Sequence, residues 1–312
     1  MNNSNPLPLI SVAMATYNGM PYLQQQVESL LAQIYTNLEI VISDDGSEDG
    51  TVEYLEKQQA GDSRIVLKLN KDQHGIKNNF SNALLHCHGE YILLCDQDDY
   101  WLPGKIEAMF SKIGDAALIY HDSLFVDEAG ASLGKKMSER FNCYEGNDPR
   151  AFLLYNCVSG HAAMFRRDII SGTLPFPEAR YHDWWLVFAS ATKGNINYLP
   201  EVFVHYRQHQ SSDTDLLRRK KNRKYISETE KFRAEATWYQ RAASLGGNQQ
   251  AYIKTWAEHY AKREHQWLSI WIFKELLRKR NLLMFIRRRR GAGLFIESLK
   301  KLWGLRLKRF FG

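Results

Sequence analysis

The first hundred residues alternate between short apolar runs and segments with helical periodicity, and this alternation restricts the chain to few folds. The apolar runs lie at residues 10–15, 38–43 and 91–95. Between them, apolar residues recur at helical spacing from Tyr22 to Ile34 and from Ile76 to Leu84. Strands that alternate with helices indicate a doubly wound sheet with right-handed crossovers. We therefore predict a Rossmann-like α/β fold with a mostly parallel sheet.

Polar residues follow each of the three predicted strands. Thr-Tyr-Asn-Gly at 16–19 follows the first, Asp-Asp-Gly-Ser at 44–47 the second, and Asp-Gln-Asp-Asp-Tyr-Trp at 96–101 the third. In open α/β sheets, ligands bind beyond the carboxyl ends of the parallel strands. Because all three polar ends share that edge, we predict a ligand site there.

The three carboxylates at the end of the third strand need a compensating charge. Asp96 and Asp98 are separated by one residue, so in extended backbone they project to the same side. Crowded carboxylates repel one another unless a metal ion or positive groups balance them. This pattern favours a divalent cation and the phosphates that it carries. The alternative is an acidic turn that caps the next helix, with Asp98 or Asp99 as the N-cap.

Eight short segments within residues 8–212 occur in the order and approximate spacing of a known family. They are 16–19, 44–51, 74–80, 89–92, 96–101, 160–161, 182–185 and 206–209. With these segments the chain resembles the family 2 glycosyltransferases, which are inverting enzymes with one nucleotide-sugar-binding domain of the GT-A type. Three of the segments are most similar to bacterial transferases that build surface polysaccharides, rhamnosyltransferases among them.

The resemblance implies a metal site. Asp98 would bind Mg²⁺ or Mn²⁺ directly, because hard cations take oxygen ligands, and the sequence does not choose between the two ions. Asp96 would lie near the ribose or the sugar. His209 matches a late position that supplies a metal ligand or a phosphate contact, and His205 is the alternative for that role.

The resemblance also implies the nucleotide pocket. Asp45 matches the position that accepts a hydrogen bond from the pyrimidine imide, while Asp44 is expected to hold the turn. Lys77 and Arg207 are candidates for phosphate binding, although an exposed lysine is the ordinary case. The predicted nucleotide-sugar-binding residues are Thr16, Tyr17, Asn18, Asp45, Lys77, Asp96, Asp98 and Arg207.

Asp183 matches the general base of the family, which removes the proton of the acceptor hydroxyl. Trp184 and Trp185 follow it and would desolvate the carboxylate and stack on a sugar. The structural alternative for Asp183 is an N-cap of the apolar helix that follows. The predicted acceptor or sugar pocket comprises Trp101, Gly160, His161, Trp184 and Trp185.

The basic character of the chain resides in its C-terminal end. Residues 274–312 carry thirteen Lys and Arg against two Glu, a net charge of +11, whereas residues 1–273 carry −5. Aromatic and aliphatic residues alternate with these cations. This composition suits helices that lie in the interface of an anionic membrane. The alternatives are nucleic acid, for which no binding motif is present, and a helical face that pairs with protein.

The remaining features place the chain inside the cell. The four cysteines show no CxxC or Cys/His ligand spacing, which indicates reduced thiols. We see neither a signal peptide nor an apolar stretch long enough to span a membrane. We therefore predict a cytoplasmic protein that is peripheral on the inner face of the cell membrane. Its catalytic domain would cover residues 1–212, and residues 213–312 would form a basic, amphipathic helical region.

These observations predict a metal-dependent inverting glycosyltransferase of cell-surface glycan synthesis. It would move a sugar from dTDP-rhamnose or a UDP-sugar to a polysaccharide or lipid-linked saccharide, without a nucleic-acid partner. One alternative is a nucleotidyltransferase of similar fold, although the segment at 15–19 is not the Gly-rich loop of such enzymes. The other is a non-catalytic scaffold at a membrane surface, which would leave the carboxylates without purpose.

Overall fold

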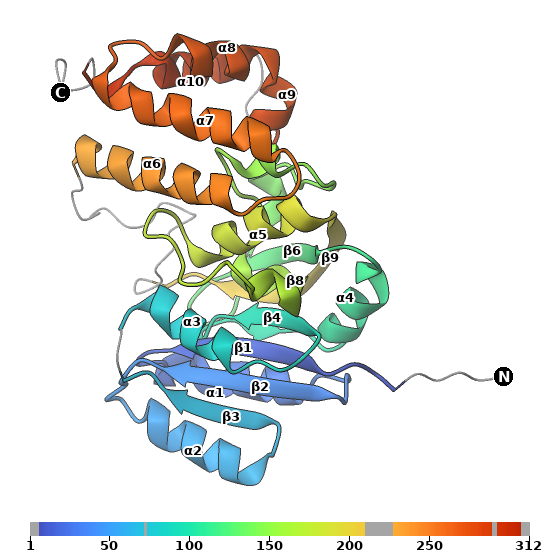
Figure 1. Ribbon diagram of the computed structural model, residues 1–312. Coiled ribbons are helices and arrows are strands. Elements are labelled where there is room, and N and C mark those ends of the chain that lie inside the picture. Colours follow the sequence, from blue (N-terminus) through green and yellow to red (C-terminus); the bar gives the residue numbers. More distant parts are fainter. Residues whose placement is uncertain (1–5, 72–73, 210–226, 289–291, 307–312) are drawn as a thin grey trace.

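A computed structural model of the protein describes residues 6–71, 74–209, 227–288 and 292–306 (Figure 1). Its strands are β1 (Ile10–Thr16), β2 (Leu38–Asp44), β3 (Ile65–Leu69), β4 (Tyr91–Cys95), β5 (Tyr100–Trp101), β6 (Leu118–Val126), β7 (Ser132–Lys136), β8 (Ala163–Arg166) and β9 (Ile196–Arg207). Within the described residues they form one sheet in the order β3-β2-β1-β4-β8-β6-β9-β5, and β7 pairs with β6.

The first four strands are parallel and carry helices on both faces. Successive side chains of a strand point to opposite faces. Met14 of β1 accordingly packs in one apolar cluster with Leu23 of α1, and Ala13 packs in the other with Phe80 of α3. This arrangement confirms the predicted α/β fold. The helices of this half are α1 (Met20–Leu31), α2 (Thr51–Gly61), α3 (Ile76–Leu85) and α4 (Lys105–Ile113).

The second half of the sheet is mixed. β8 lies antiparallel between β4 and β6, β9 is parallel to β6, and β5 is antiparallel to β9. Tyr100 pairs with His205 across β5 and β9. This pairing brings the C-terminal end of β9 next to the acidic turn after β4, although the two segments are about a hundred residues apart in sequence.

The first helix is shorter than its apolar periodicity predicts. α1 ends at Leu31, and the side chain of Ile34 is 65% exposed. Ile34 continues the spacing of the helix but follows its last turn, so we correct the predicted helix end.

The C-terminal helices stack on α5 (His182–Lys193), as the upper part of Figure 1 shows. Trp238 packs edge-on against Trp185 and Phe188 of α5, with ring centroids 5.6 and 5.0 Å apart. One apolar cluster therefore continues from the sheet into these helices. The predicted division at residue 212 stays a prediction, and residues 210–226 lie outside the described residues. The helices are α6 (Glu228–Ser244), α7 (Gln250–Lys262), α8 (Ile270–Arg278), α9 (Arg280–Leu283) and α10 (Ala292–Leu302).

The apolar residues of the basic region divide into a buried and an exposed group. Ile272, Leu276 and Leu283 are at most 1% exposed, because they pack between helices. They are therefore not available to a membrane, contrary to the expectation for the whole region. The exposed group, which we call the outer apolar patch, comprises Trp267, Leu268, Ile270, Leu277, Phe285, Phe295, Ile296 and Trp303.

Candidate active site

A cavity of about 1110 Å³ opens at the carboxyl ends of β1, β2 and β4. It extends from the nucleotide-type turns at Asn18 and Asp45, past the acidic turn, to the first turn of α5. The sequence placed a ligand site at this edge, and the structure has a cavity there. The predicted site residues that line it are Thr16, Tyr17, Asn18, Asp45, Asp96, Asp98, Gly160, His161, Asp183, Trp184 and His209.

Asp44 and Asp45 have separate functions in the turn after β2. Asp44 is fully buried and accepts hydrogen bonds from Thr16 Oγ1 at 2.7 Å and from the Ser47 N–H at 2.8 Å. It therefore holds the turn, as predicted. Asp45 lines the cavity and accepts hydrogen bonds from the Gly75 N–H at 2.6 Å and from Asn70 Nδ2 at 2.8 Å. These bonds fix the orientation of the Asp45 carboxylate in the cavity wall.

Residues at and just after the C-terminal end of β9 contact the acidic turn after β4. Asp98 Oδ2 lies 2.7 Å from His209 Nε2, and Asp99 Oδ1 accepts a hydrogen bond from the Arg207 N–H at 3.0 Å. The next helix, α4, has Gly104 as its N-cap. The alternative that Asp98 or Asp99 caps this helix is therefore wrong.

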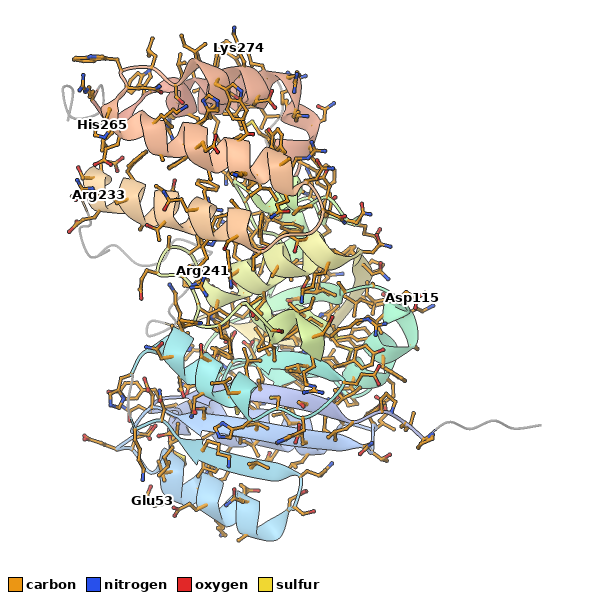
Figure 2. The ribbon with its side chains drawn as sticks, viewed as in Figure 1. Glu53, Asp115, Arg233, Arg241, His265 and Lys274 are labelled. Carbon is orange, nitrogen blue, oxygen red and sulfur yellow. The ribbon has the colours of Figure 1, made fainter. Side chains whose placement is uncertain are left out.

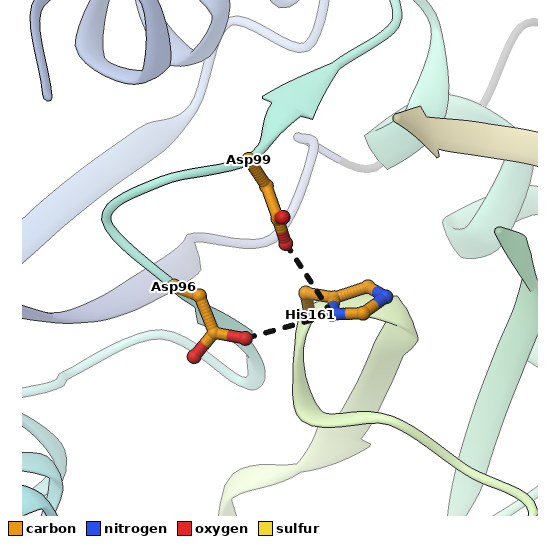
Figure 3. A group of neighbouring side chains, drawn as sticks. All are labelled: Asp96, Asp99 and His161. Atoms are coloured by element: carbon orange, nitrogen blue, oxygen red, sulfur yellow. Dashed lines mark ion pairs between the residues drawn. The ribbon is translucent and has the colours of Figure 1, made fainter. Parts of the chain in front are cut away.

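His161 joins the other two carboxylates of the turn. Its Nδ1 lies 3.5 Å from Asp96 Oδ2 and 3.3 Å from Asp99 Oδ2, so both contacts in Figure 3 end on the same ring nitrogen. Its Nε2 lies 3.0 Å from Ser123 Oγ. Burial raises the pKa of Asp99 well above its ordinary range, and the neighbouring Asp98 and Asp96 carboxylates add to the effect. Burial lowers the pKa of His161.

The residues of this turn fit a divalent cation. One ligand atom each from Asp96, Asp99 and His161 lie within 4.8 Å of one another. Asp99 Oδ2 is buried, and no described residue donates a hydrogen bond to it. The carboxylate oxygens are ligands that Mg²⁺ and Mn²⁺ prefer, whereas imidazole nitrogens are preferred by softer transition metals. His161 and Asp99 thus join Asp98 and His209 as candidate ligands.

Asp183 lies in the first turn of α5 at the wall of the cavity. Its Oδ2 accepts a hydrogen bond from the Gly160 N–H at 3.2 Å, and its Oδ1 accepts one from the Trp184 N–H at 2.5 Å. Burial raises the pKa of Asp183 to about 7, although the two hydrogen bonds lower the pKa in part. The N-cap of α5 is Tyr181. The N-cap alternative for Asp183 is therefore wrong.

The structure places two predicted phosphate-binding cations outside the cavity lining. Lys77 Nζ donates hydrogen bonds to the carbonyl oxygens of Pro177, at 2.8 Å, and Glu178. Arg207 Nε donates to the Asp98 carbonyl at 2.9 Å, and its Nη1 donates to the Glu128 carbonyl at 2.8 Å. Arg207 therefore positions the acidic turn, whereas Lys77 holds the loop at 177–178, which does not line the cavity.

Two predicted pocket tryptophans and one histidine also lie elsewhere. Trp101 is 1% exposed and packs under Lys105, whose Nζ is 3.1 Å from the ring centroid. Trp185 is fully buried and donates a hydrogen bond to the Thr173 carbonyl at 2.9 Å. Both are core residues, so we correct their assignment to the pocket. His205, the alternative to His209, faces Tyr100 and does not line the cavity.

Several groups near the site escaped sequence reasoning. Lys105 is fully buried and donates a hydrogen bond to the His161 carbonyl at 2.6 Å. Gln97 bridges the turn to β1, because its Oε1 accepts from the Tyr17 N–H at 2.8 Å. The far wall of the cavity consists of Met137, Phe141 and Tyr155. The position of Gln97 between two aspartates of the acidic turn could have indicated that it lies at the site. Nothing in the sequence distinguished Lys105 from an exposed lysine.

Comparison with known protein families identifies the family of this chain. Residues 11–173 match the model of Glycosyl transferase family 2. The chain belongs to this family. Its membership supports glycosyl transfer over the nucleotidyltransferase and scaffold alternatives.

Similar proteins include enzymes named for glucosyl transfer. A UDP-Glc:alpha-D-GlcNAc-diphosphoundecaprenol beta-1,3-glucosyltransferase of Escherichia coli is 26% identical over 65% of this chain and 79% of its own length. A GalNAc(5)-diNAcBac-PP-undecaprenol beta-1,3-glucosyltransferase of Campylobacter jejuni is 25% identical over 64% of this chain and 65% of its own. An uncharacterized glycosyltransferase of Nostoc is 26% identical, over 66% of its own length.

The fold is also that of a solved glycosyltransferase. A crystal structure of S. aureus TarS in complex with UDP-GlcNAc superposes with a TM-score of 0.58 at 17% identity, over 93% of this chain and 81% of the other. The likeness confirms the GT-A fold and extends over the C-terminal helices as well, because it covers nearly the whole chain.

Proposed function

We propose that this family 2 enzyme transfers a sugar from a nucleoside diphosphate sugar to a saccharide acceptor with inversion at the anomeric carbon. The observation that carries the proposal is one cavity that holds Asp45 at one end, Asp98 with His209 in the middle, and Asp183 beyond. UDP-sugars are the first donors to test, since the names of the E. coli relative and the TarS complex contain them. dTDP-rhamnose remains the second candidate.

The donor would lie along the nucleotide end of the cavity. Thr16, Asn18 and Asp45 would hold the base and ribose, and the acidic turn would hold the diphosphate. A divalent cation bound by Asp98 and His209, beside Asp96, would neutralise the charge that develops on the diphosphate as it leaves. Arg207 and His161 keep the turn in place for this purpose, through the contacts of the Arg207 N–H and of His161 Nδ1 with Asp99.

Asp183 would take the proton of the acceptor hydroxyl. A general base is most effective when its pKa lies near the working pH, and burial has raised the pKa of Asp183 to about 7. The N–H groups of Gly160 and Trp184 hold the carboxylate in one orientation. Trp184, which lines the cavity and donates its indole N–H to the Phe152 carbonyl at 2.7 Å, would form the wall beside it.

Transfer is expected to invert the anomeric configuration. Within the described cavity Asp183 is the one carboxylate with a raised pKa that stands apart from the acidic turn. A single base supports direct displacement from the face opposite the leaving group. NMR of the product anomer checks this expectation. Retained configuration, or a glycosyl-enzyme intermediate trapped by rapid quenching, would contradict it.

The acceptor that we propose is a lipid-linked saccharide at the cytoplasmic membrane surface. The E. coli and C. jejuni relatives are named for undecaprenol-linked acceptors. None of the helices in the described part of the chain is long and apolar enough to cross a membrane. The outer apolar patch includes Ile270 and Leu277 of α8 and Phe295 and Ile296 of α10, and α8 also carries Lys274, which Figure 2 labels at the outer end of the molecule. Exposed apolar side chains beside cations support peripheral binding to anionic lipid.

Substitution of the outer apolar patch is expected to weaken membrane binding. Ile270 of α8 is 56% exposed and Ile296 of α10 is 52% exposed. Replacing both with Ser should lower partitioning onto phosphatidylglycerol liposomes by at least about tenfold, because the exposed half of each isoleucine contributes roughly 0.8–1.5 kcal/mol when it is buried. Ile34→Ser, at an isoleucine that is 65% exposed far from these helices, is the matched control. Equal sedimentation of the three proteins with liposomes would defeat the membrane proposal. Truncation is a poorer test, since α6 buries Trp238 against α5.

A further inference from the structure

We propose that Tyr155 is the stacking platform of the acceptor saccharide and that Glu297 of α10 fixes its position. The proposal rests on the proposed function and names the part of the cavity that receives a pyranose ring. It also gives the C-terminal helices a part in the reaction besides packing.

The acceptor must lie on the side of Asp183 away from the nucleotide. Residues 155–160 line the cavity in an unbroken row that ends at Gly160, whose N–H donates to Asp183. Met137 and Phe141 complete this wall. The wall contains no carboxylate and no cation, in contrast to the acidic turn on the other side. It is therefore suited to the apolar face of a sugar.

Helix α10 and the segment before it hold this wall from behind. The Tyr155 hydroxyl donates a hydrogen bond to Glu297 Oε1. Arg287 Nη2 lies 3.5 Å from the same oxygen, and the Arg287 guanidinium carbon lies 5.1 Å from the centroid of the Tyr155 ring. Phe141 forms an isolated β-bridge with Arg287. Two cavity-lining aromatic residues are thus fixed by one short stretch of the C-terminal region.

These contacts determine which part of Tyr155 can meet a ligand. The hydroxyl proton is engaged by Glu297, and Arg287 covers one face of the ring. The rest of the side chain packs in part against the main apolar cluster and in part lines the cavity. An aromatic face binds the C–H groups of a pyranose, and its orientation is preorganised because ion-paired side chains hold it.

Tyr155→Leu is expected to raise the KM for GlcNAc-diphosphoundecaprenol about tenfold, as truncation of a packed aromatic anchor does. Glu297→Ala should raise the acceptor KM with the donor KM unchanged, and Glu297→Gln should restore most of the affinity. The matched control is Tyr252→Leu. Tyr252 also donates to a glutamate, Glu275 Oε2 at 2.9 Å, and also lies near Arg150, but it does not line the cavity.

A second measurement does not require turnover. Saturation-transfer NMR with methyl α-N-acetylglucosaminide should give a signal in wild type and in Tyr252→Leu that is lost in Tyr155→Leu. An unchanged acceptor KM together with an unchanged NMR signal in Tyr155→Leu would overturn the platform. A Tyr155-dependent signal in a protein that transfers no sugar would support the platform and overturn the proposed reaction, so the two failures are distinguishable.

Discussion

Asp183→Asn is expected to lower turnover by about 10²- to 10⁴-fold while the protein folds and binds donor as before. The amide oxygen of Asn can still accept one of the two N–H groups of Gly160 and Trp184, which bond to different oxygens of the carboxylate, but the amide cannot take a proton from an acceptor hydroxyl. Single-turnover kinetics with saturating donor separates the chemical step from binding. The control is Asp168→Asn, at an exposed aspartate that does not line the cavity. Near-wild-type rates in Asp183→Asn would remove this residue from the mechanism.

The pH dependence of the wild-type enzyme follows from the same group. A general base acts as the carboxylate, so activity should rise as the pH increases through about 7 and should be lost below it. A raised folded-state pKa favours the neutral acid, so ionisation of Asp183 costs stability as the pH rises from about 4 to 7. Asp183→Asn should abolish both dependences. A pH–rate profile without a step near 7 would contradict the assignment.

Asp98→Ala is expected to abolish metal-dependent nucleotide binding. It removes the carboxylate that pairs with His209 at 2.7 Å, and thus the ligand expected to hold the cation in contact with the diphosphate. Calorimetry with UDP or dTDP, in the presence of Mn²⁺, Mg²⁺ or excess chelator, measures the effect. Asp96→Ala should weaken binding less completely.

The control for this experiment is Asp115→Ala. Asp115 is exposed just after α4, where Figure 2 labels it, and it does not line the cavity. The control should bind nucleotide as wild type does. Two results would contradict a metal role for Asp98: full activity of the wild type in excess chelator, or an Asp98→Ala affinity that still depends on metal.

The sequence predicted the parallel half of the fold because its strands are continuous apolar runs with polar ends. Such strands are buried on both faces, and their pattern is local. The antiparallel half was not predictable in this way. Its pairings join β4 to β8 and β5 to β9, which depend on contacts between residues about 70 and about 100 positions apart, respectively.

Individual site residues were predictable only where a sequence motif determined both their position in the fold and whether their side chains face the cavity. Adjacent residues on a helix point about 100° apart. Of the two neighbouring tryptophans, Trp184 lines the cavity and Trp185 is buried in the core. The sequence alone does not indicate which of them faces the cavity. Lys105 shows the same limit, since a lysine in the first turn of a helix normally faces solvent. In the C-terminal region, amphipathic periodicity alone does not separate a helix that packs on protein from one that lies on lipid.

The central claim is that the cavity activates a nucleoside diphosphate sugar for transfer. The most direct test incubates the protein and a divalent cation with a panel of UDP-, dTDP- and GDP-sugars and GlcNAc-diphosphoundecaprenol, and identifies the nucleotide released. Release of a nucleoside diphosphate from one donor, with its sugar recovered on the acceptor and the reaction lost in Asp183→Asn, is the predicted result. Release of pyrophosphate, or transfer that persists in Asp183→Asn, would contradict the account.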